Sequence, residues 1–181
     1  TKTEVREIVR STGLPTYDKP ESQEICFVQD RSYADFVEKY SGDGQTKDGE
    51  IVNLDGEVVG AHSGVHKYTV GQRKGLVASG KPQYVVRIEP NENRVVIGND
   101  SDTESRRFAV RDTNWIGIDH ITEPIRCDIQ IRNRFEPRPG TLYLENEALF
   151  VEFDEPQRAV SPGQAAVFYW DDVVVGGGWI R

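Results

Sequence analysis

One of the two cysteines in this chain, Cys26, lies between a polar turn and an apolar run in the stretch "KPESQEICFV". A thiol placed where a loop enters a regular element is well positioned for chemistry, yet an ordinary thiol has a pKa of about 8.5 and is only slightly ionised at neutral pH. Glu21 and Glu24 would raise that pKa, whereas Lys19 would lower it only if the fold brought it close. Spacing alone leaves both a structural and a reactive role open for Cys26.

The other cysteine, Cys127, belongs to the alternating stretch "RCDIQIRNRF". Successive side chains of a strand point to opposite faces, so Cys127, Ile129 and Ile131 share an apolar face. We therefore expect Cys127 to be buried as a small hydrophobic residue. The polar face carries Arg126, Asp128, Gln130, Arg132 and Arg134, and these arginines form either a solvated face balanced by carboxylates or a stripe that contacts phosphate groups.

Other polar groups of possible chemical use are weaker candidates. His62 and His66 have i, i+4 spacing, but Gly64 between them disfavours the helix that would bring both to one metal, and no cysteine or carboxylate cluster completes a zinc set. We expect no metal site. The stretch "GQRKG" (71–75) is too short for a phosphate-cradling loop and precedes no helix; its Arg73 and Lys74 fit either an RNA contact or an ordinary surface turn.

Composition sets broad limits on function. The 181 residues carry a net charge of −8, which makes nucleic-acid binding a poor first expectation because phosphate contacts dominate such affinity. Residues 1–64 hold 7 basic and 13 acidic side chains, and residues 65–181 hold 15 and 17, so the excess of acid lies in the first part. Two cysteines in a chain of this length indicate a reducing compartment, and we expect a cytoplasmic location.

No apolar run approaches the roughly 18 residues of a membrane span, and the polar start "TKTEVREIVR" is unlike a signal peptide. We expect no membrane association. The sequence begins with Thr1 and contains no Met, so we expect it to be a fragment.

The hydrophobic period changes along the chain. "TKTEVREIVRSTGLP" predicts a helix with a capping box between Thr1 and Glu4, and "RSYADFVEKYSG" predicts a second helix. Asp55-Gly56 predicts a hairpin between "EIVNL" and "EVVGAH". Many short strands follow: "QYVVRIEP", "RVVIGN", "RFAVRD", "IRCDIQIRNRF", "TLYLE", "ALFVEF", "QAAVFYW" and "VVVGGGWIR".

These patterns predict a mainly β protein. We expect a small α+β domain at residues 1–64 and an antiparallel β-domain, either a closed barrel or a sandwich, at residues 65–181. The boundary is expected near "HSGVH" (62–66), where the helical, acidic part ends.

Four blocks, in order along nearly the whole chain, resemble the tRNA-specific 2-thiouridylase family: "DKPESQEICFV", "YTVGQRKGL", "RCDIQIRNR" and "AVSPGQAAVFYWDDVVVGGGWI". The resemblance implies a small central domain followed by a C-terminal β-barrel like those of translation factors. It also implies ATP-dependent transfer of sulfur to C2 of the wobble uridine of tRNA. The sulfur would travel as a persulfide on the cysteine that matches Cys26. It would come from a persulfide relay protein or a cysteine desulfurase.

The same resemblance carries over the tRNA contacts. Arg132, Asn133 and Gln164 match positions at which the family touches tRNA, and we add the adjacent Arg134. Alternation places Arg132 and Arg134 outward but Asn133 inward, so Asn133 would need a strand end or a bulge.

The sequence departs from the family in lacking the N-terminal PP-loop domain, with its "SGGxDS" phosphate loop. The resemblance assigns to that domain the ATP site and a second cysteine that pairs with the first during turnover; Cys127 does not match it. We therefore expect the chain by itself to be inactive in thiolation. The alternative function is a non-catalytic β-barrel module that binds RNA or protein, with Cys26 as a packing residue.

Overall fold

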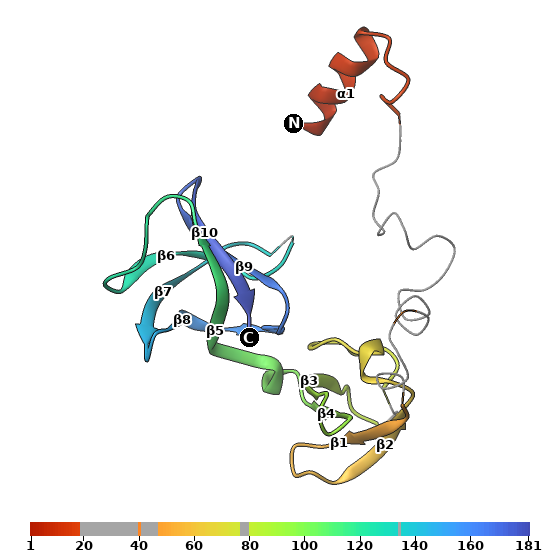
Figure 1. The fold of residues 1–181 in the computed structure, drawn as a ribbon. Coiled ribbons are helices and arrows are strands. Elements are labelled where there is room, and N and C mark those ends of the chain that lie inside the picture. The colour runs from red at the N-terminus through yellow and green to blue at the C-terminus, as the bar shows by residue number, and fades with distance from the viewer. Residues whose placement is uncertain (19–39, 41–46, 77–79, 134) are drawn as a thin grey trace. The chain divides into compact units, whose positions relative to one another are not determined.

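The computed structural model describes residues 1–18, 40, 47–76, 80–133 and 135–181, and the chain divides into two compact units, Thr1–Gly42 and Asp43–Arg181. The first unit contains helix α1 (Lys2–Ser11), drawn in red in Figure 1. The expected capping box is present: the Thr1 hydroxyl accepts a hydrogen bond from the Glu4 amide, and the Glu4 carboxylate accepts one from the backbone of Thr1. This confirms the first predicted helix; the second lies outside the described residues apart from Tyr40.

The second unit begins with a small mixed sheet. Its strands are β1 (Gly49–Val52), β2 (Val58–His62), β3 (Tyr84–Glu89) and β4 (Arg94–Gly98), in the order β2-β1-β4-β3. The predicted hairpin is confirmed, with β1 antiparallel to β2 and Gly56 at φ 83° in the turn. Strand β1 pairs in parallel with β4. Four buried side chains form the core of this sheet: Ile51, Val85, Val95 and Ile97.

The remaining strands close into a six-stranded antiparallel barrel in the order β10-β5-β8-β7-β6-β9 (Figure 1). They are β5 (Glu104–Trp115), β6 (Ile125–Gln130), β7 (Arg138–Glu145), β8 (Ala148–Arg158), β9 (Ala165–Trp170) and β10 (Val173–Ile180). The structure thus has the expected mainly β class. Periodicity allowed either a barrel or a sandwich, and the structure is a closed barrel. Side chains at alternate positions of the strands point inward and fill the interior, where five are fully buried: Ile129, Leu142, Val151, Phe153 and Phe168.

Two 3-10 turns flank the second half of the small sheet, η1 (Val65–Lys67) before it and η2 (Ser101–Thr103) after it. Strands β3 and β4 belong to the same sheet as β1 and β2, although they lie beyond residue 64, where the first domain was expected to end. The barrel strands begin only at Glu104. The change of pattern near "HSGVH" therefore marks the end of a hairpin within one sheet, because the partner of β1 in that sheet comes from residues further along the chain.

Candidate nucleic-acid interface

Two of the predicted site residues, Cys26 and Arg134, lie outside the described residues. Cys127, by contrast, is buried in β6 with 8% of its surface exposed, as its alternation predicted. Burial raises the pKa of the Cys127 thiol to about 12; the nearby Asp128 carboxylate adds to the rise and Arg126 opposes it. The thiol is therefore neutral at physiological pH, which makes it a packing group and a poor nucleophile.

We expect Cys127 to resist alkylation in the folded chain. In a Cys26→Ser chain, iodoacetamide at mildly alkaline pH should label Cys127 only after denaturant is added, which mass spectrometry can follow. Since burial raises the pKa of the folded thiol to about 12, the unfolded thiol loses its proton at a lower pH, and the unfolded state binds fewer protons between the two pKa values. The free energy of unfolding should therefore fall as the pH rises through that range. Rapid labelling of the folded chain would contradict the buried, neutral thiol.

The Arg132–Asn133 pair lies in a turn that follows β6. The strand ends at Gln130, the next residue Ile131 is buried, and Arg132 and Asn133 are both exposed. The alternation that predicted an inward Asn133 does not apply to it, because the strand has already ended. The expected strand end exists, and it removes the conflict between periodicity and the predicted contact.

Hydrogen bonds hold this turn in place. The Gln130 side-chain amide donates to the carbonyl oxygen of Phe135 at 2.8 Å, and the Tyr169 hydroxyl donates to the Gln130 side-chain oxygen at 3.2 Å. The Arg132 guanidinium lies over the Phe135 ring, 5.2 Å from its centre. It also donates to the carbonyl oxygen of Arg158 at 3.4 Å. The turn thus presents Arg132 from a braced backbone.

Gln164 occupies a second turn at the same region of the barrel. Its backbone amide donates to Ser161 at 3.2 Å and its carbonyl accepts from Ile180 at 2.8 Å, while Gly163 provides the left-handed φ of 82° that the turn needs. Ser161 is nearly buried and donates to the carbonyl of Ala159 at 3.2 Å. The Gln164 side chain itself is exposed, so its backbone is fixed and its amide is available to a ligand.

The structure brings the two predicted contacts to one segment, residues 158–164. Arg132 binds the carbonyl of Arg158 at the start of this segment, and Gln164 ends it. The segment also contacts the preceding part of the unit: the Ala159 amide donates to Thr103 at 2.9 Å, and a Cβ added to Gly71 would lie 2.6 Å from that of Ala159. Residues far apart in sequence thus share one surface.

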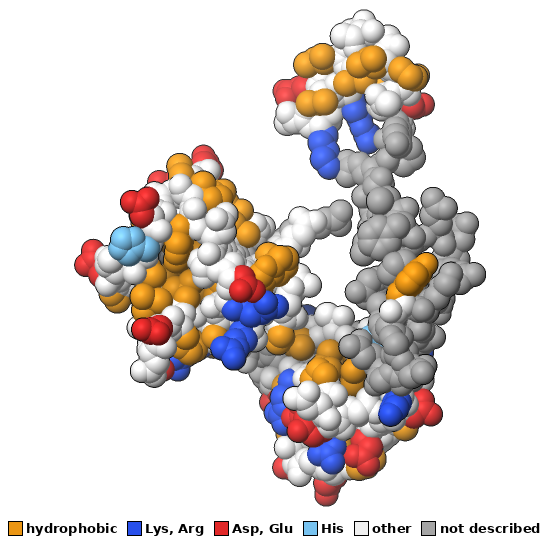
Figure 2. Space-filling model, in the orientation of Figure 1, with side chains coloured by type: hydrophobic (Ala, Val, Ile, Leu, Met, Phe, Trp, Pro, Cys, Tyr) orange, Lys and Arg blue, Asp and Glu red, His pale blue; other side chains and the backbone are white. Residues whose placement is uncertain are grey.

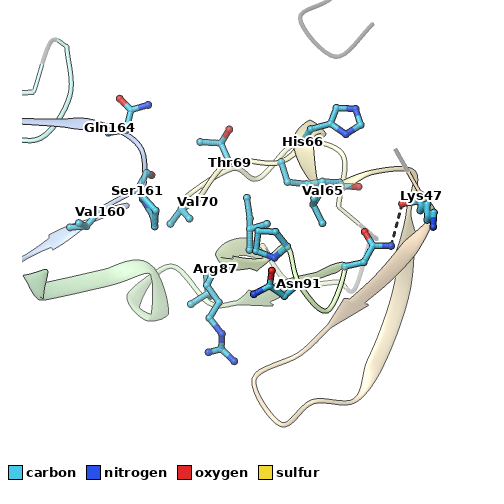
Figure 3. Close-up of a pocket in the computed structure, with 16 residues that line it drawn as sticks. Lys47, Val65, His66, Thr69, Val70, Arg87, Asn91, Val160, Ser161 and Gln164 are labelled. Atoms are coloured by element: carbon cyan, nitrogen blue, oxygen red, sulfur yellow. Dashed lines mark hydrogen bonds between the residues drawn. The ribbon is translucent and has the colours of Figure 1, made fainter. Parts of the chain in front are cut away.

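Beside this segment lies a groove of about 1080 Å³ (Figure 3). Figure 3 shows Ser161 and Gln164 at one side, Lys47 at the other, and Thr69 and His66 between them. Strand β3 and the turn after it supply Arg87 and Asn91. Sequence reasoning did not identify Lys47, Arg87 or Asn91, because no local pattern links Lys47 to the hairpin that holds the other two residues.

The 71–75 loop does not offer a phosphate site for the ATP that the resemblance implies. In the 71–75 loop, the Gly71 amide donates to Val85 at 2.7 Å and the Gln72 amide donates to Thr69 at 2.9 Å. Amides that are already bonded within the fold cannot cradle a phosphate group. ATP therefore does not fit this loop.

Both ring nitrogens of His62 are engaged in the fold. The Gly64 amide donates to Nδ1 at 3.0 Å, and Nε2 lies 3.1 Å from the carbonyl oxygen of Asn93, so Nε2 carries the proton that it donates.

Within the described ranges, no three His, Cys, Asp or Glu side chains are grouped as metal ligands. In the same ranges no helix has the length and apolar character needed to cross a membrane.

Comparison with known protein families finds three models that match successive parts of the chain. Residues 1–30 match the tRNA methyl transferase HUP domain, residues 34–99 the tRNA methyl transferase PRC-barrel domain, and residues 105–180 the aminomethyltransferase beta-barrel domain. The second match contains the whole small sheet, and the third contains all but the first residue of the barrel strands.

Three curated relatives show the extent of the similarity. The tRNA-specific 2-thiouridylase MnmA of Koribacter versatilis is 45% identical over 99% of this chain and 50% of its own length. The proteins of the same name from Acetivibrio thermocellus and Clostridioides difficile are 46% and 42% identical, over 100% and 99% of this chain and 51% and 50% of their own lengths. The chain spans about half the length of the curated relatives it matches.

Proposed function

This chain belongs to the tRNA-specific 2-thiouridylase family, and from that premise we propose that it carries sulfur on Cys26 and binds tRNA through its barrel. The observation that supports tRNA binding is that the Arg132 guanidinium donates to the carbonyl of Arg158, at the start of the segment that ends with Gln164. Arg132 and Gln164 come from two separate sequence blocks, and both side chains are exposed. An arginine and an amide side chain on braced turns suit contacts with phosphate and sugar groups of RNA.

The proposed chemistry is a sulfur transfer in which Cys26 holds a persulfide. A donor protein, either a persulfide relay protein or a cysteine desulfurase, loads the terminal sulfur in the cytoplasm. ATP would activate the C2 oxygen of the wobble uridine as an adenylate, the terminal sulfur would attack C2, and AMP would leave with that oxygen. The second cysteine of the family would then attack the Cys26 sulfur, break the S–S bond and form a disulfide with Cys26, which leaves the sulfur on the base. The base must leave the stack to be reached. A persulfide is more acidic than its parent thiol, so Glu21 and Glu24 in the motif "ESQEICF" are compatible with this role.

We assign ATP to a part of the enzyme other than the described residues, because the 71–75 loop offers it no site. The 181 residues by themselves are therefore expected to bind tRNA without thiolating it. Their net charge of −8 does not oppose this role, since residues 65–181 are close to neutral and can present a local basic surface.

We predict that Arg132→Gln weakens tRNA binding by the 181-residue chain about threefold to tenfold and makes the slope of log K against log salt shallower by about one. The matched control is Arg138→Gln, since Arg138 is also an exposed barrel arginine but pairs with Glu136 at 2.9 Å. Fluorescence anisotropy of labelled tRNA over a salt series measures both quantities. Equal affinities of the Arg132 variant and the unchanged chain would contradict the proposed interface.

A further inference from the structure

Most arginines of the second unit are neutralised by nearby carboxylates. Among its described residues, eight arginines lie within ion-pair distance of an acidic side chain. Arg126 makes two hydrogen bonds to Asp154, at 2.5 and 2.7 Å, and Arg158 binds Asp100 at 2.6 Å. Figure 2 shows acidic and basic side chains close together over the small sheet. Such pairs cancel much of each other's field, so they attract a polyanion weakly.

Five cations of this unit depart from this pattern. In the described part of the chain, no carboxylate forms an ion pair with Lys47, Arg73, Lys74, Arg132 or Arg181. Arg132 belongs to the interface already described, and Lys47 lines the groove beside it. Arg73 and Lys74 follow Gly71, which lies against Ala159 of segment 158–164. Most of the uncompensated charge therefore collects around that segment and the groove.

The groove lining also lacks carboxylates. Its sixteen lining residues include no Asp or Glu, although the chain contains 30 of them. Lys47 supplies positive charge, Asn91 and Gln164 supply amide groups, and Tyr68 adds an aromatic side chain. Arg87 also lines the groove, but its guanidinium is paired with Glu89 at 2.7 Å. Positive charge, amide donors and an aromatic side chain together suit the phosphate, sugar and base groups of RNA.

We propose that this groove and the adjoining 71–75 loop continue the tRNA-binding surface from Gln164 onto the small sheet. Lys47, Arg73 and Lys74 contact phosphate groups, and the groove holds a stretch of the RNA backbone. This inference rests on the proposed function, because it extends the same interface. RNA fits better than an acidic protein, because the groove is lined by Gln164 of the proposed tRNA interface and so continues that interface.

The test compares two triple variants of the 181-residue chain with equal changes in net charge. Lys47→Gln/Arg73→Gln/Lys74→Gln removes unpaired cations, and Arg94→Gln/Arg111→Gln/Arg138→Gln removes arginines that pair with carboxylates. We expect the first to bind tRNA at least about tenfold more weakly, with a salt slope shallower by about two to three. The second should stay close to the unchanged chain. Thermal unfolding verifies that each variant is folded.

Further measurements separate the possible failures. Ultraviolet cross-linking of tRNA to the unchanged chain should label peptides from residues 65–75, and labelling confined to the barrel would overturn the inference. If the first triple variant binds tRNA normally while Arg132→Gln does not, the groove proposal fails and the proposed function stands. If the folded, unchanged chain binds no tRNA, both fail. If the variant loses only binding to polyglutamate, the groove serves an acidic protein and the RNA proposal is overturned.

Discussion

Replacing Cys26 with serine is expected to reduce tRNA thiolation by the complete enzyme at least about a thousandfold, because a hydroxyl oxygen cannot accept and release a sulfane sulfur. Affinity for tRNA should persist, since the proposed binding surface lies on the barrel and the groove and does not include Cys26. Thiouridine in digested tRNA, measured by mass spectrometry, follows the reaction. Intact-protein mass spectra should show one additional sulfur atom on the unchanged enzyme and none on the variant.

The matched control is Cys127→Ala. Cys127 is buried and its pKa is raised to about 12, so its removal should leave thiolation intact and cost only some stability. Thiolation that survives Cys26→Ser would remove the sulfur-carrier role and favour the non-catalytic module, with Cys26 as a packing residue. Loss of thiolation with Cys127→Ala in a folded enzyme would mean that the reaction needs Cys127, which would contradict its role as a packing residue.

Phe168→Ala is expected to lower the free energy of unfolding of the barrel by about 3 to 5 kcal/mol, because it leaves a cavity in a well-packed interior. Phe168 is fully buried in β9, pairs across the sheet with Ile129, and lies 5.9 Å from the Trp115 ring. Denaturant unfolding followed by tryptophan fluorescence measures the change. Because β9 is bonded to β6, which leads into the Arg132 turn, tRNA binding should be lost with the fold.

The comparison for this variant is Phe150→Ala on β8. Phe150 is only partly buried; its ring stacks on Tyr143 at 6.0 Å and lies under the Arg107 guanidinium at 4.0 Å. Its loss removes surface contacts without opening the interior, so the expected cost is less than half that of Phe168→Ala. Equal costs at the two positions would mean that the barrel interior does not carry the stability of this domain.

Local features of the fold could be predicted from the sequence. The capping box of Thr1 and Glu4 and the Asp55-Gly56 turn depend on residues within a few positions of each other. The burial of Cys127 followed from a period of two along a single strand. The candidate tRNA residues were found by resemblance, and Cys26 remains a prediction from its motif.

Long-range pairing decided the rest. The parallel ladder of β1 with β4 joins segments more than 40 residues apart, and closure of the barrel joins β10 to both β5 and β9. Neither leaves a local pattern, because strand order depends on packing of the whole sheet. The same holds for the interface: which arginines meet a carboxylate, and which remain as unpaired charge around segment 158–164, is determined only when distant strands are brought together.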